Sequence, residues 1–133
     1  MSQALQSAVF ARLSADPDLT ALVGTAIYDS LPAGVLPSLY VSLGPETVRD
    51  RSDQTGRGAR HDIVISVLSD AGGFAAAKAA AAAVNEALLG AELVLTRGRV
   101  VTLGFERAKA LRVEAGRMRR IDLTFRVRTD DDT

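Results

Sequence analysis

The side chain best suited to acid–base chemistry in this sequence is His61, the only histidine, which is followed directly by Asp62. Imidazole titrates near neutral pH, so a histidine beside a carboxylate suggests general acid–base catalysis. Both residues fall in a segment of alternating hydrophobicity, however, and adjacent residues of a strand point to opposite faces of a sheet. The pair therefore does not form a catalytic dyad, and we expect His61 to be a packed or surface residue.

Other residue patterns that carry chemistry are missing from the sequence. With no cysteine, disulfides, thiolate zinc sites and thiol nucleophiles are excluded. Asp50 and Asp53 lie in a polar segment and 130–132 in an acidic tail, without the converging ligands that a metal site needs. The segment 56–58 lacks the spacing of a P-loop or dinucleotide fingerprint, and Gly-x-Ser-x-Gly does not occur. We therefore predict no catalytic residue, no metal ion and no cofactor.

The formal net charge of zero conceals a division of charge along the chain. Residues 1–96 carry six basic and ten acidic side chains, whereas residues 97–128 carry ten basic and three acidic ones. A basic half beside an acidic half is able to bind nucleic acid, or to dock head to tail against a second copy. Aromatic residues for base stacking are not interleaved with the arginines, which weakens the case for nucleic acid. A solvated sheet face rich in arginine is the third interpretation.

Length and composition indicate one ordinary globular domain. The 133 residues, 47% of them hydrophobic and 24% charged, suffice for a single core, and we assign residues 1–133 to one domain. The amino end has one arginine and no long apolar run, so it does not resemble a secretory signal. No segment is apolar enough over about 20 residues to span a membrane. We expect a soluble intracellular product with no membrane partner.

The first half of the chain predicts short helices and strands separated by turn residues. The spacing of Leu5, Val9 and Leu13 predicts a helix over 3–15, and Asp16-Pro17 supplies the cap and first turn of a second helix. Five further segments are predicted as strands or loops from their alternation and their proline and glycine content. These are a strand over 26–29, a loop over 30–37, a strand over 39–43 stopped at Gly44-Pro45, a strand over 46–51 and an exposed loop over 52–58.

The second half predicts an antiparallel sheet. Residues 59–68, 99–113 and 117–128 alternate between apolar and polar side chains, with a hairpin loop over 114–116 and a short strand over 92–96. Such alternation is typical of a sheet with one buried and one solvated face. We predict an α+β fold in which an antiparallel sheet of about four to five strands packs against one alanine-rich helix, with short helices at the amino end.

The alanine-rich helix is predicted over 73–89, between glycines. Phe74, Ala77, Ala81, Val84 and Leu88 fall on one stripe, which we predict to face the core. The opposite side is unusual for a surface helix because alanines replace charged residues. It is interpreted either as a face that approaches another subunit or as a consequence of general alanine richness. The four alanines assigned to this helix packing face are Ala75, Ala79, Ala82 and Ala83.

Across nearly its whole length the chain resembles a family of tail completion (tail terminator) proteins from long-tailed bacteriophages and bacterial gene transfer agents. The resemblance is carried by the order and spacing of four segments, none of them catalytic, and the chain departs from the usual pattern at Leu68, where most members have an aromatic residue. The segments are LQSAVFARLSADPDLTALVGTAIYDSLP, LYVSLGPETVRDRSD, HDIVISVLSDAGG with the alanine-rich helix after it, and GRVVTLGFERAKALRVEAGRMRRIDLTFRVRT.

The resemblance implies a structural virion protein that assembles in the bacterial cytoplasm as a ring, expected to be a hexamer. The ring is expected at the head-proximal end of the tail tube, where it ends tube polymerisation and joins the tail to the head or neck. Its implied partners are further copies of itself, the tail tube protein and a neck or stopper protein, with DNA only as passing cargo. The alternatives are a head–tail neck adaptor and a small nucleic-acid-binding module.

Residue roles follow as hypotheses from this resemblance and from the charges. A loop that orders on contact with the tube or a neighbouring subunit is assigned to Arg49, Asp50, Arg51, Asp53 and Arg57. Arg117, Arg119 and Arg120 at the hairpin are assigned to subunit contacts or to the channel. Charge reversal at Arg49 and Arg51 is expected to give a soluble monomer that fails to end tails.

Overall fold

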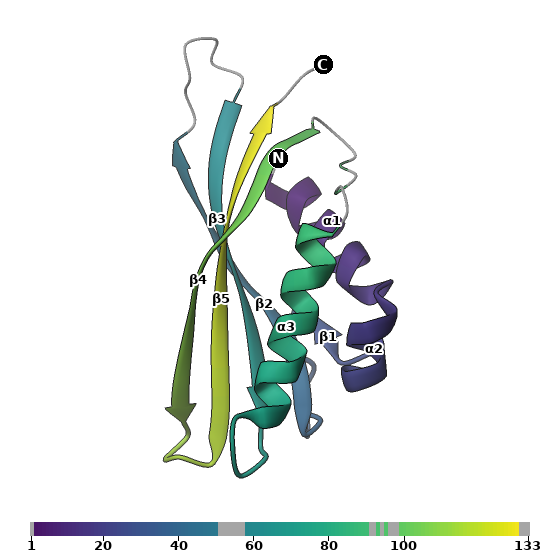
Figure 1. Cartoon of the computed structure of the whole chain (residues 1–133), viewed down its shortest axis with the longest axis vertical. Coiled ribbons are helices and arrows are strands. Elements are labelled where there is room, and N and C mark those ends of the chain that lie inside the picture. The colour runs from purple at the N-terminus through teal and green to yellow at the C-terminus, as the bar shows by residue number, and fades with distance from the viewer. Residues whose placement is uncertain (1, 51–57, 91–92, 94, 96–98, 131–133) are drawn as a thin grey trace.

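The protein forms two layers, a twisted five-stranded sheet and three helices that cover one of its faces (Figure 1). The computed structural model describes residues 2–50, 58–90, 93, 95 and 99–130. Among these residues no helix is long and apolar enough to cross a membrane. The elements in chain order are α1 (Ser2–Ser14), α2 (Pro17–Val23), β1 (Ile27–Tyr28), β2 (Leu39–Asp50), β3 (Gly58–Ser69), α3 (Ala75–Leu89), β4 (Arg99–Val113) and β5 (Met118–Asp130).

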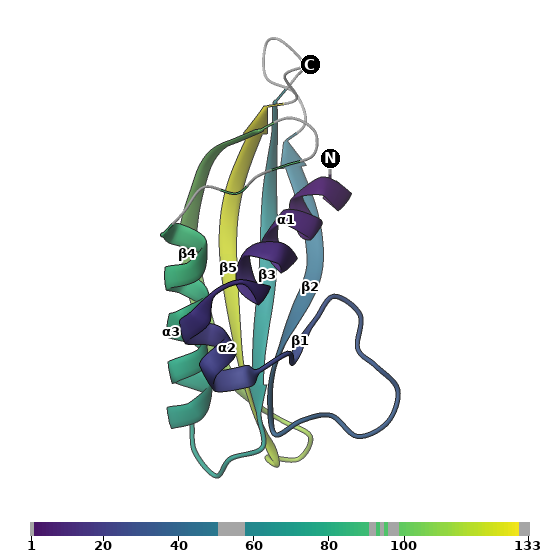
Figure 2. The same ribbon diagram turned by 90° about the vertical axis from the view of Figure 1, so that its right-hand side faces the viewer.

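The sheet confirms the predicted α+β class, with one exception to the predicted antiparallel pairing. Its strand order is β1-β2-β3-β5-β4, and β2, β3, β5 and β4 pair antiparallel in that order. The short strand β1 pairs parallel to β2, with Ile27 opposite Val41. The chain leaves β1 through a long loop and re-enters the sheet in the same direction, which makes this pair parallel (Figure 2).

Strand β2 is longer than the sequence predicted. Gly44-Pro45 was expected to stop a strand, but β2 continues through both residues to Asp50. Its pairing with β3 shifts register between Leu43 and Glu46, so the glycine and proline mark an irregularity within the strand rather than its end. The strand expected over 92–96 falls mostly outside the described residues, and Leu93 and Leu95, which are described, are not in a strand.

The junction between α1 and α2 has the predicted capping chemistry. The Asp16 carboxylate accepts a hydrogen bond from the Leu19 N–H at 2.9 Å, and Pro17 occupies the first turn of α2. Gly24 ends the helix with a positive φ of 62°, a conformation that favours glycine. These local signals fix a sharp change of direction that lays α1 and α2 against α3.

Helix α3 is buried on more sides than its sequence pattern predicted. Ala77, Ala81, Val84 and Leu88 are buried as expected, and Phe74 is half-buried. Ala80, Ala83 and Ala87 are buried as well, because α1 and α2 pack on a second side of the helix while the sheet covers the first. The Arg12 Nε donates to the Ala87 carbonyl at 2.8 Å across the α1–α3 contact. The assignment of Ala83 to an exposed face is therefore wrong, whereas Ala75, Ala79 and Ala82 are exposed.

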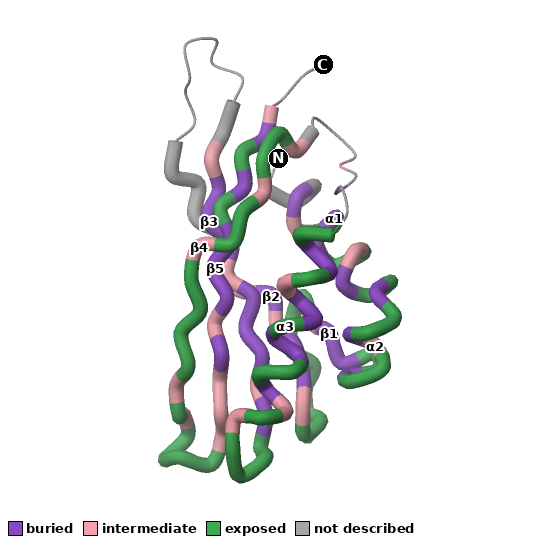
Figure 3. The backbone as a smooth tube through the Cα atoms, viewed as in Figure 1, coloured by how far each residue is buried: buried purple, intermediate pink, exposed green. Residues whose placement is uncertain are grey.

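The core lies between the sheet and the helices (Figure 3). Phe125 is its largest fully buried side chain among the described residues, and it lies with Leu123 and Val127 on the inner face of β5, between β3 and the edge strand β4. The sequence pattern of β3 and β5 predicted this inner face correctly. Strand β4, at the edge of the sheet, has mostly exposed side chains because α3 covers only part of it. The described residues of the edge strand β4 therefore leave much surface available for contact.

Candidate assembly surfaces

The hairpin between β4 and β5 contains Arg117, Arg119 and Arg120, which the sequence analysis grouped together. Their side chains lie in three different environments. Glu114, Ala115 and Gly116 all have positive φ, which gives a tight turn. Arg117 lies exposed in that turn. Arg119 faces the helices and donates to the carbonyls of Gly116, at 2.7 Å, and Gly72, at 3.0 Å. Arg119 therefore ties the hairpin tip to the turn before α3.

Arg120 lies on the opposite, helix-free face of the sheet. Its Nε donates to Asp122 at 2.7 Å, and the Ser66 hydroxyl donates to the same carboxylate oxygen at 2.7 Å. Tyr40 is buried nearby. Burial raises the pKa of the Tyr40 phenol, the negative charge of Glu114 raises it further, and the positive charge of Arg120 opposes the increase. The three hairpin arginines thus do not form one patch.

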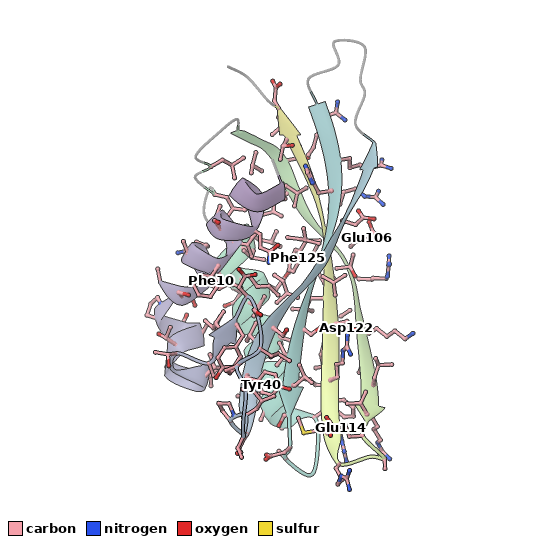
Figure 4. The ribbon with its side chains drawn as sticks, turned by 180° about the vertical axis from the view of Figure 1, so that it is seen from behind. Phe10, Tyr40, Glu106, Glu114, Asp122 and Phe125 are labelled. Atoms are coloured by element: carbon pink, nitrogen blue, oxygen red, sulfur yellow. The ribbon has the colours of Figure 1, made fainter. Side chains whose placement is uncertain are left out.

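A second group of charges lies farther along the helix-free face. Arg126 forms ion pairs with Glu106, at 2.7 Å, and with Asp62, at 3.6 Å, and Arg107 pairs with Glu106 at 2.5 Å. Glu106 is the extra residue at a register shift in β4, since Phe105 pairs with Phe125 and Arg107 with Thr124. Figure 4 shows Glu106 on the side of the sheet away from the helices and Phe125 directed toward them. Much of the positive charge on this face is therefore balanced within the chain.

His61 and Asp62 lie on opposite faces of β3, as their adjacent positions predicted. His61 is 1% exposed in the core, where its Nε2 lies 3.1 Å from the Thr129 hydroxyl oxygen. Asp62 faces the ion pairs around Arg126. The geometry brings the two side chains to different environments, so they do not act together. Among the described residues no three His, Asp or Glu side chains converge as a metal site would require.

A groove of mixed polar and apolar lining lies between the end of α3 and the start of β4. It has a volume of about 300 Å³ and is lined by 88–90, Leu93 and 100–103. A second hollow of about 420 Å³ continues along β4 and shares Thr102 and Leu103 with the first. Leu89 and Val101 line the first hollow and Phe105 lines the second, and each of the three is between 44% and 46% exposed. Among the described residues these three apolar side chains therefore remain partly exposed at the two hollows.

An apolar surface lies at the opposite edge of the sheet, on the loop between β1 and β2. Val35 is fully exposed and Leu31 is 51% exposed, while Leu36 packs against the core and anchors the loop. The loop projects beside β2, on the other side of the molecule from α3 and β4 (Figure 2). The sequence predicted an irregular segment here, but gave no indication of how its apolar side chains would be oriented.

The loop assigned to tube or neighbour contact is only partly described. Arg51, Asp53 and Arg57 lie outside the described residues. Arg49 and Asp50 are the last residues of β2, as the predicted strand over 46–51 implied, and so they are not part of a loop. Their contact with the tube or a neighbour stays a prediction. The long antiparallel pairing of β2 with β3 extends the strand to this point.

The comparisons with known proteins agree with one another. A family model described as tail completion protein gp17 matches residues 7–130. A chain in the solved structure of the virion of a native gene transfer agent particle is 64% identical to this one, with a TM-score of 0.92. The match covers 97% of this chain and 96% of that one. No curated protein sequence matches significantly.

Proposed function

This chain belongs to the family of tail completion protein gp17, and we propose that it forms a ring at the head-proximal end of a tail tube, where it ends tube polymerisation and joins the tail to the head or neck. Its family makes it a structural protein of a virion tail. The observation that carries the proposal is the family match over 7–130, together with a 64% identical chain of nearly equal length in a gene transfer agent virion.

The distribution of surfaces supports a ring of identical subunits. The basic strands β4 and β5 lie toward one edge of the sheet, and β1 and β2, toward the other edge, belong to the acidic part of the chain that begins at α2. Contact between two unlike surfaces of identical chains is heterologous, and heterologous contacts close into rings when the rotation between neighbours permits. We expect the ring to be a hexamer, as the resemblance implied.

Ending a polymer requires two unlike ring faces. One face must complement the last ring of tube subunits, and the other must not offer the surface to which another tube ring would bind. The second face is then free for a head or neck protein. This mechanism needs no chemical step, which agrees with the buried position of the only histidine.

Passage of DNA through the ring would be hindered by a strongly attractive wall. The ion pairs of Arg120 with Asp122 and of Arg126 with Glu106 reduce the attraction of the helix-free sheet face for phosphate. This internal balance supports DNA as passing cargo rather than as a bound ligand.

Position within the particle tests the proposal. The chain would carry a peptide tag at its carboxyl end, and gold-labelled antibody would locate it in purified particles by electron microscopy. We expect label at one position, between the tube and the head. Label along the whole tube, or at the far tip, would contradict the proposal, and label on the head after tails are detached would favour a neck adaptor.

A further inference from the structure

We infer that two copies of this chain bind one another through the exposed face of α3, with the two helices antiparallel and related by a two-fold axis at Ala82. The face consists of Ala75, Lys78, Ala79, Ala82 and Glu86, all of them exposed. This contact goes beyond the proposed function and does not depend on it, because it joins two chains of the purified protein rather than the subunits of a ring.

The charges of this face lack a counter-charge in the single chain. Lys78 and Glu86 are exposed, and within the part of the chain that the structure describes neither side chain has a hydrogen bond or an ion pair. They are eight residues apart, about 12 Å along the helix axis, whereas ion pairs within a helix form between residues three or four apart. The two opposite charges therefore do not satisfy each other within one helix.

The spacing of the two charges is self-complementary. Ala82 lies midway between Lys78 and Glu86, and at about 100° per residue the three side chains fall on one stripe of the helix. In an antiparallel pair with its two-fold axis at Ala82, Lys78 of each copy lies opposite Glu86 of the other. A parallel pair in register would place like charges opposite one another instead, so the charges select the antiparallel orientation.

The shape of the face permits a close approach of two helices. Ala75, Ala79 and Ala82 lie between and beside the two charges, and their small side chains allow the helix axes to come within about 8 Å of each other. Helix α3 also lies at the margin of the helix layer, where α1 and α2 pack on one side of it only (Figure 2). Among the described residues, no other helix or strand covers the side of α3 that faces the reader in Figure 1.

The contact is isologous, because the same residues of both copies meet, and it is complete at two chains. It therefore differs from the heterologous contact proposed for the ring, and it leaves both edges of the sheet free. Helix α3 has 15 residues and is about 22 Å long, so the contact is smaller than a standard interface between two proteins. We expect a weak dimer, with a dissociation constant between about 10 μM and 1 mM.

Charge reversal tests the contact by sedimentation velocity of the purified chain at concentrations from about 5 μM to 1 mM. The single variants Lys78→Glu and Glu86→Lys should each dimerise about tenfold more weakly than the natural chain, because each places like charges opposite one another. An equimolar mixture of the two variants should recover the natural affinity within about threefold, since each chain then meets its complement. The matched control is Lys109→Glu, which reverses the other lysine of the chain, exposed on β4, and should leave dimerisation unchanged.

A cysteine at the two-fold axis gives a second measurement, because the chain has none of its own. Ala82→Cys lies next to its own copy in the dimer and should form a disulfide-linked dimer on mild oxidation. Ala75→Cys is the control on the same face, since the two-fold axis separates it from its own copy by about 21 Å along the helix. It should stay monomeric on a non-reducing gel.

Each outcome separates the dimer from the proposed function. A natural chain that is monomeric over the whole concentration range would overturn the inference, as would undiminished dimerisation of the two single variants or a mixture without recovery. Equal cross-linking of the Ala82→Cys and Ala75→Cys chains would contradict the two-fold axis. These results leave the position of the chain in the particle unaffected, whereas label along the whole tube would refute the proposed function and leave the dimer intact.

Discussion

The guanidinium of Arg119 lies over the ring of Phe74, with its central carbon 5.6 Å from the ring centroid. This cation–π contact joins the start of β5 to the residue that precedes α3. Together with the hydrogen bonds from Arg119 to the Gly72 and Gly116 carbonyls, it fixes the hairpin tip against the end of the helix. The sequence analysis assigned Arg119 to subunit contacts or to the channel, but in the structure its side chain makes contacts within its own chain.

Replacing Arg119 by alanine should therefore lower the free energy of unfolding. We expect a loss of about 1–2 kcal/mol, because the cation–π contact and two charge-assisted hydrogen bonds disappear from a partly exposed position. Urea denaturation measures the change. Arg117→Ala is the control, since Arg117 is exposed in the turn, and it should change stability by less than about 0.5 kcal/mol. Equal losses for the two variants would contradict the structural role of Arg119.

Gly44 should not tolerate alanine, although it lies in a strand. An added Cβ would lie 2.9 Å from the Val64 carbonyl oxygen, which belongs to the backbone of the paired strand. We expect Gly44→Ala to cost about 1–3 kcal/mol of stability because the two strands must move apart. Gly104→Ala is the matched control in β4, where a Cβ meets nothing within 4 Å. A Gly44→Ala chain as stable as the Gly104→Ala chain would show that the close approach is absent.

Phe125 should be the costliest single core position. It is fully buried and packs edge-on against Phe105, with the ring centroids 5.8 Å apart. Phe125→Ala is expected to lower the free energy of unfolding by about 3–5 kcal/mol, through lost transfer energy and a residual cavity. Phe105→Ala should cost clearly less, because Phe105 is 44% exposed. Thermal unfolding of the two variants gives the order, and the reverse order would contradict the assigned faces of β4 and β5.

Ionisation of Tyr40 should lower the stability of the folded chain at alkaline pH. Burial, reinforced by Glu114, raises the pKa of Tyr40 above its ordinary value of 10.0, so the folded chain holds the phenolic proton more tightly than the unfolded chain does. The contribution of the protonated Tyr40 phenol to the free energy of unfolding is fully present below the ordinary pKa of tyrosine. It is lost as the pH rises through the raised pKa of the folded chain. The free energy of unfolding should therefore fall more between about pH 8 and pH 11 in the natural chain than in Tyr40→Phe. An identical fall in both chains would contradict the raised pKa.

Local sequence signals predicted the elements that depend on neighbouring residues alone. The Asp16 cap, Pro17 and the turn over 114–116 are examples, since each is determined by a few consecutive residues. The predictions were wrong where the structure of a segment depends on contacts with distant parts of the chain. Gly44-Pro45 was read as a strand end because pairing with β3 is not visible locally, and Ala83 was placed on an exposed face because the position of α1 and α2 was unknown.

The candidate surfaces were harder to predict than the fold for the same reason. The groove exists because α3 ends beside β4, and the exposure of Val35 depends on where the loop leaves the sheet. Neither feature has a sequence motif. The sequence analysis treated the hairpin arginines as one group, but alternation along β5 places Arg119 and Arg120 on opposite faces. The family resemblance, in contrast, was visible in the order of the segments and is confirmed by the family match.

The central claim is that this chain ends the tail tube, and its removal is the most direct test. Particles from cells that lack the gene would be examined by electron microscopy, with the lengths of at least several hundred tails measured and a complemented strain as the control. We predict tubes without heads and of irregular, extended length, with normal particles restored on complementation. Tails of normal length joined to filled heads in the absence of this chain would contradict the account.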